Sequence, residues 1–161
     1  MPLYRVSKNG AVISIVGGSE TIAFFAELSG GLVGPISFVA QGLGRSNGEH
    51  EFWIRERLSV GDELVIGVLD EGEDVARNRA AENFAPQISN RESLTLSLTL
   101  NGNRKGQLSA SENDSVGVNL SWKEGDSATL VSLSSSGRDQ SGKSVEYELF
   151  VGDTVAIRAS N

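Results

Sequence analysis

The sequence contains no cysteine, only three prolines and a single histidine among its 161 residues. The absence of cysteine excludes a disulfide scaffold, a zinc–thiolate site and a cysteine nucleophile. It is also typical of proteins in a reducing compartment, so we predict a cytoplasmic location. Scarce proline leaves extended segments uninterrupted, whereas the 19 glycines suit many tight turns.

Long apolar runs are also missing from the chain. No stretch approaches the roughly 18 apolar residues that a membrane-spanning helix requires. Residues 1–5 lack the basic and apolar pattern of a secretory signal. We therefore expect no membrane partner.

Positive charge is scarce, because 14 Lys and Arg stand against 21 Asp and Glu, giving a net charge of −7. Most of the excess lies in residues 1–74, which carry five basic and eleven acidic side chains; residues 93–161 carry six and eight. An acidic surface repels nucleic-acid phosphates, whose binding depends on Lys and Arg. We expect no nucleic-acid partner. A basic protein partner for the first half is one interpretation of this acidity, and the alternative is that the charge serves only solubility.

What the chain does contain is an internal duplication. Asn9-Gly10 recurs as Asn101-Gly102, and the turn Val60-Gly61-Asp62 recurs as Val151-Gly152-Asp153. Between these markers, Gly44-Arg45 recurs as Gly137-Arg138. Because the order of the three markers is preserved, we interpret them as parts of one duplicated unit.

Apolar and polar residues alternate along most of the chain, which predicts β-strands. The clearest case is 94–100, where leucine alternates with threonine or serine as in a half-buried strand. Each Asn-Gly pair favours a two-residue hairpin turn. Residues 20–28 also fit a helical stripe, but their duplicate, 114–122, alternates as a strand does, so we predict a strand for both.

We therefore predict an all-β protein of two tandem, similar antiparallel units, residues 1–74 and 93–161. The linker, residues 75–92, includes the helix-favouring run 75–82 and is expected to hold a short helix. Units near 70 residues are marginally stable alone. The two copies should therefore pack around an approximate two-fold axis and share a core, as a sandwich or a barrel.

The first copy resembles a group of small bacterial β-proteins. The resemblance rests on Gly42-Leu43, Gly48-Glu49-His50, Trp53 and the segment 58–66, which includes Val60-Gly61-Asp62-Glu63. It covers about the first 75 residues. Because that group has no settled activity, the resemblance implies the fold and no catalytic residues.

His50 is the first candidate for chemistry, because it lies between Glu49 and Glu51. A general base oriented by a carboxylate is one interpretation. Adjacent strand residues point to opposite faces, however, so a solvent-facing residue is the better one. With one histidine and no cysteine, we predict no metal site and no cofactor.

Gly137–Ser144 formally matches a phosphate-binding loop, Gly-x4-Gly-Lys-Ser. Such a loop requires a helix after it, whereas residues 145–149 alternate as a strand does. We interpret the match as accidental.

Trp53 is the strongest candidate for binding. Strict alternation would place Trp53 with Arg55 and Arg57 on one face of a strand, opposite Phe52, Ile54 and Leu58. An exposed tryptophan beside two cations is typical of binding hot spots. The alternative is that Trp53 covers the edge of the core. Trp122 continues an apolar alternation and is expected in the core.

These observations favour a non-enzymatic protein that binds another macromolecule, such as an inhibitor or immunity-type partner of a basic protein. The binding candidates are Trp53, Arg55, Arg57, His50, Arg45 and Arg138. One alternative is a carbohydrate- or small-ligand-binding module that stacks its ligand on Trp53 or Tyr4; another is a hydrolase that uses His50. A homo-oligomer is compatible with each. Since the acidity and the Glu49-His50-Glu51 stretch do not recur, any site should lie in the first copy or at the seam between copies.

Overall fold

The structure is a computed structural model that describes residues 2–46, 48–70, 80–81, 90–110, 114–136 and 145–161. The strands of the first copy are β1 (Leu3–Lys8), β2 (Ala11–Gly17), β3 (Thr21–Gly31), β4 (Ile36–Gly44), β5 (His50–Leu58) and β6 (Glu63–Leu69). A two-residue strand, β7 (Ala80–Ala81), follows. Those of the second copy are β8 (Leu94–Leu100), β9 (Asn103–Ala110), β10 (Ser115–Lys123), β11 (Thr129–Ser136), β12 (Val145–Leu149) and β13 (Thr154–Ser160).

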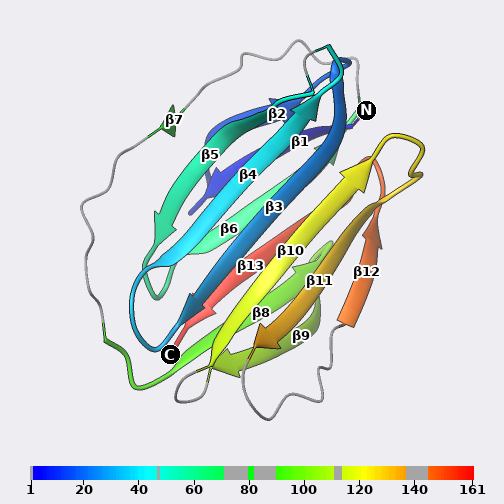
Figure 1. Ribbon diagram of the computed structural model, residues 1–161. Helices are drawn as coiled ribbons and strands as arrows, with labels where there is room; N and C mark the ends of the chain where they lie inside the picture. The colour runs from blue at the N-terminus through cyan, green and yellow to red at the C-terminus, as the bar shows by residue number, and fades with distance from the viewer. Residues whose placement is uncertain (1, 47, 71–79, 82–89, 111–113, 137–144) are drawn as a thin grey trace.

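The strands form two sheets that pack face to face as a sandwich (Figure 1). Sheet A has the order β2-β1-β6-β13-β8-β9, and sheet B has the order β12-β11-β10-β3-β4-β5-β7. All pairings are antiparallel except that of β5 with β7. The predicted all-β class is therefore confirmed.

The approximate two-fold axis is visible in the strand order. In sheet A the copies meet where β6 pairs with β13, and in sheet B they meet where β3 pairs with β10. Apart from β7, each sheet has the same order from either end once every strand is replaced by its duplicate. Both copies contribute to both sheets, so they share one core, as expected for units too small to bury enough apolar surface alone.

The core is built from the inward faces of the predicted alternations. The four leucines of β8 are at most 8% exposed, since β8 lies between β13 and β9. Tyr4 stacks on Phe24 with ring centroids 3.9 Å apart, and Phe24 faces Trp53 at 6.2 Å. Trp122 is 7% exposed, as predicted.

The repeated turn residues contact one another in each copy. The Asn9 side-chain amide donates to the Asp62 carboxylate at 2.8 Å, and the Asn9 side-chain oxygen accepts from the Glu63 N–H at 2.9 Å. In the second copy, Asn101 makes the same two bonds to Asp153 and Thr154, at 2.9 and 2.8 Å. We call this pair of contacts the Asn–Asp clasp.

Backbone geometry explains why asparagine and glycine occupy these turns. Asn9 and Asn101 have φ angles of 51° and 48°, and the glycines after them have 83° and 80°. Positive φ at two successive positions is the signature of a type I′ turn, which asparagine and glycine tolerate best. The hairpin turns are therefore confirmed.

The Val-Gly-Asp turns also join the two copies. The Gly61 N–H donates to the Ala159 carbonyl at 2.8 Å, and the Gly152 N–H donates to the Val68 carbonyl at the same distance. Each turn thus extends the β6–β13 ladder toward the other copy. Each Val-Gly-Asp turn therefore bonds to its own copy through the Asn–Asp clasp and to the other copy through its backbone N–H.

The predicted linker helix is wrong where the structure describes it. Ala80 and Ala81 form a strand that pairs in parallel with Ile54 and Arg55 of β5. Backbone pairing with an otherwise open sheet edge overrides the helix preference of alanine. The rest of the run 75–82 lies outside the described residues.

Candidate functional site

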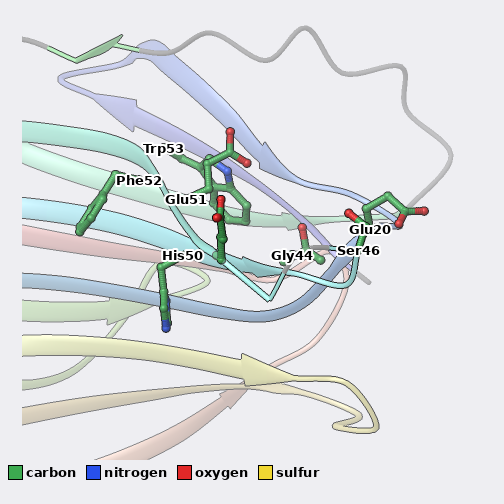
Figure 2. Close-up of a pocket in the computed structure, with 10 residues that line it drawn as sticks. Glu20, Gly44, Ser46, His50, Glu51, Phe52 and Trp53 are labelled. Atoms are coloured by element: carbon green, nitrogen blue, oxygen red, sulfur yellow. The ribbon is translucent and has the colours of Figure 1, made fainter.

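A hollow of about 640 Å³ opens beside the first-copy edge of sheet B. Its walls come from the start of β3, the end of β4, the turn that follows β4 and the first half of β5. Figure 2 shows Glu20 and Ser46 at one end, and His50 and Phe52 at the other. All its described lining residues belong to the first copy: Glu20, Thr21, Gly42, Gly44, Ser46, Glu49, His50, Glu51, Phe52 and Trp53.

The hollow is acidic. Three of its lining residues, Glu20, Glu49 and Glu51, carry carboxylates, and its described lining includes no Lys or Arg. Glu20 and Glu49 are exposed, and Glu51 is half-buried. This arrangement attracts a cationic group.

Backbone hydrogen bonds fix the walls of the hollow. The Arg45 N–H donates to the Glu20 carbonyl at 2.7 Å, and the Gly44 N–H donates to the Glu49 carbonyl at 3.1 Å. The start of β3 and the β4–β5 turn are therefore tied together. Glu20 was not a candidate from the sequence, because it lies far from Glu49 along the chain.

Trp53 does not face the solvent beside Arg55 and Arg57. It is 9% exposed and belongs to the core, whereas Phe52, expected inward, is 48% exposed. The reason is a register shift: Ala40 pairs with Ile54, but Gln41 pairs with Phe52, so Trp53 is an extra residue in β5. Such a β-bulge turns Trp53 and Ile54 inward together, which strict alternation cannot predict.

Gly42 makes room for the Trp53 ring. A Cβ at Gly42 would lie 2.0 Å from the nearest ring atom of Trp53. Glycine inside a strand often marks such a close approach. The buried tryptophan therefore depends on two local features, the bulge and the glycine opposite it.

Phe52 takes the surface place that strict alternation would give to Trp53, and Trp53 follows the alternative in which it covers the core. The guanidinium carbon of Arg55 lies 4.3 Å from the centre of the Phe52 ring, a cation–π contact. Both side chains are exposed. An aromatic residue beside a cation is therefore present on the surface, but the aromatic residue is Phe52.

The remaining candidate cations do not gather at the hollow. Arg45 is exposed and forms an ion pair with Glu124 of the β10–β11 turn. Arg57 is half-buried, and its carbonyl accepts a hydrogen bond from Lys8 at 2.9 Å. Arg138 lies outside the described residues, as does the whole of the Gly137–Ser144 sequence match.

Tyr4, a candidate ligand-stacking residue, is fully buried. Its hydroxyl lies 2.6 Å from the Thr129 hydroxyl. Burial raises the pKa of Tyr4 far above its ordinary value, more than this hydrogen bond lowers it. Tyr4 and Trp53 are therefore core residues, and the predicted sugar-stacking platform is wrong for both.

His50 is exposed at the rim of the hollow. In Figure 2 its ring lies well apart from Glu20 and Ser46. This placement agrees with the solvent-facing interpretation. Among the described residues, no group of three or more His, Asp or Glu is placed to hold a metal ion.

Comparisons with known protein families, with curated proteins and with solved structures gave no match. The resemblance to small bacterial β-proteins therefore stays a prediction. In the part of the chain that the structure describes, no helix is long and apolar enough to cross a bilayer.

Proposed function

We propose that this chain is a non-enzymatic binding protein that engages a basic protein partner through the acidic hollow. The observation that carries the proposal is the charge of the lining, three carboxylates with no Lys or Arg among the described lining residues. A Lys or Arg side chain that enters the hollow gains charge-assisted hydrogen bonds. An inhibitor or immunity-type role, in which an acidic protein covers a basic one, is the form of this function that the charge favours.

The rim of the hollow adds an apolar contact. Phe52 is 48% exposed and is held by Arg55, so its ring can pack against the partner with little loss of side-chain freedom. Aromatic residues and arginine are enriched in binding hot spots. The net charge of −7 would also steer a basic partner toward the protein at low salt.

The carbohydrate-binding alternative has lost the two residues on which it was based, since Trp53 and Tyr4 are buried. An aromatic platform would have to use Phe25 and Phe52, which are 43% and 48% exposed. A glycan array, followed by sugar titrations monitored through intrinsic Trp fluorescence, separates this alternative from the first. A hydrolase that uses His50 would lose its activity in His50→Ala.

Calorimetric titration with a hexa-arginine peptide tests the proposal. Glu20→Gln/Glu49→Gln should weaken binding at least tenfold, because two of the three carboxylates are neutralised. The matched control, Asp70→Asn/Glu92→Gln, removes the same charge from two exposed residues outside the hollow. Equal weakening in both variants would contradict the proposal, because it would show attraction by net charge alone.

A further inference from the structure

The outer face of sheet B carries opposite charges at its two sides. The registers place one residue from each of six strands in a single cross-strand row: Arg55, Val39, Glu27, Asn119, Ser132 and Glu146. Directly paired residues of neighbouring strands lie on the same face. The row therefore begins with a cation on β5 and ends with an anion on β12.

In the neighbouring row, large and small side chains alternate across the strands. It contains Phe25 paired with Ser121, and Ser121 paired with Leu130. Phe25 and Leu130 are 43% and 39% exposed. A shallow hollow of about 270 Å³ is lined by Phe25, Asn119 and Ser121 among others, so space for an aromatic ring lies beside an exposed ring.

A two-fold axis parallel to the strands, between β3 and β10, would make this face complementary to itself. Such an axis turns a second molecule over, so that its β12 lies across from β5 of the first. Arg55 then faces Glu146 of the second molecule, Glu27 faces Asn119, and Phe25 faces Ser121. Every contact occurs twice, as in an isologous dimer.

The size of the face suits a stable contact. Strands of nine residues, such as β4 and β10, are roughly 30 Å long, and six strands about 4.8 Å apart span on the order of 700 Å². A standard interface buries about 800 Å² on each partner. We infer that this chain forms a homodimer through the outer faces of sheet B, with Arg55 paired to Glu146 of the second molecule. Because Phe52 lies on this same face, in the row of Phe25, the dimer and a basic partner that packs on Phe52 exclude each other.

A charge swap within one chain tests this inference by sedimentation. Arg55→Glu and Glu146→Arg should each raise the dissociation constant of the dimer at least tenfold, because each places like charges together. Arg55→Glu/Glu146→Arg should restore association. Arg158→Glu, on the outer face of sheet A, is the matched control and should leave association unchanged.

A monomeric wild type, or a folded double variant that stays dissociated, would overturn the inference. If a single variant fails to fold, a nitroxide label on Glu27→Cys gives a second measurement, because the chain has no other cysteine. The distance between labels should be shorter than that from a label on Ser97→Cys in sheet A. The opposite order of distances would overturn the inference.

Discussion

Strands β5 and β12 are duplicates, yet their outer residues carry opposite charges. Leu58 and Leu149 end the two strands and pair with Ile36 and Thr129 respectively, which fixes the equivalence. Counted back from these leucines, Arg55 and Arg57 correspond to Glu146 and Glu148. The bulge that buries Trp53 lies in β5, and the equivalent position of the second copy, 144, lies outside the described residues.

The turns show the opposite behaviour. The Asn–Asp clasp has the same donors and acceptors in both copies, with bond lengths that differ by about 0.1 Å. Positions that close the fold have stayed the same, whereas positions on the outer surface have diverged. The comparison therefore separates residues that build the sandwich from residues that are available for binding.

The largest loss of stability should come from truncating Trp53, the buried tryptophan of the first copy. Trp53→Ala should lower the free energy of unfolding by about 3–5 kcal/mol, because it leaves a large cavity in the shared core. Urea denaturation followed by circular dichroism measures this change. A loss below about 1 kcal/mol would show that the Trp53 site collapses or was not packed.

Substitutions at Gly42 and at Ser135, its equivalent in the second copy, test the same difference between the two copies. Gly42→Ala should destabilise by about 3 kcal/mol, the upper end for overpacking, because the atoms that it meets belong to a buried ring. In a Trp53→Ala background the same change should cost little. Ser135→Ala, the matched control in the second copy, should cost about 1 kcal/mol or less; equal losses at Gly42 and Ser135 would contradict the account.

The Asn–Asp clasp should give a smaller and symmetric effect. Asn9→Gly and Asn101→Gly keep the positive φ but remove the side-chain hydrogen bonds, so each should cost about 1 kcal/mol. Thermal unfolding of the two variants side by side measures the symmetry. A clear loss in one copy and none in the other would show that the clasps are not equivalent.

The smallest expected effect is a change in how the stability of the fold depends on pH. The pKa of Asp153 is lowered by hydrogen bonds from the Phe150 N–H and from Asn101. For Asp62, burial raises the pKa, but hydrogen bonds from Ser59 and Asn9, together with nearby Lys8, lower it further than burial raises it.

Carboxyls with a lowered folded-state pKa stabilise the fold above the unfolded value of about 3.9, and this stability is lost as the pH falls through the folded value. Asp62→Asn/Asp153→Asn should therefore lose less stability than the wild type between pH 6 and pH 3, as measured by urea midpoints. An unchanged acid dependence in this variant would exclude both carboxyls as its source.

Most of the fold follows from local sequence signals. The Asn-Gly turns, the leucine alternation of β8 and the order of the repeated motifs predicted the strands and the duplication. Strand order did not follow, because the pairings of β6 with β13 and of β3 with β10 join residues far apart in the chain. The contact of Asn9 with Asp62 was also missed, although its separation of 53 residues recurs as 52 for Asn101 and Asp153.

The site was less predictable than the fold. A single extra residue in β5 exchanged the faces of Phe52 and Trp53, and nothing in the alternation marks that residue as extra. Gly42 was the available sign, but it becomes informative only once its strand is known to pair with β5. The acidic hollow depends on the turn before β3, which carries Glu20, lying against the β4–β5 turn, which carries Glu49, and this contact between distant turns is not marked in the sequence.

The central claim is that the diverged residues of the first copy, and not the duplicated scaffold, bind a cationic partner. Nitrogen-15 chemical shifts recorded during titration with a hexa-arginine peptide test it most directly, because the second copy is an internal control. The account predicts changes at Glu20, at Gly42–Ser46 and at Glu49–Trp53, and unchanged signals at Ser132–Ser135 and Glu146–Leu149. Equal changes in both copies, or changes outside the hollow alone, would contradict it.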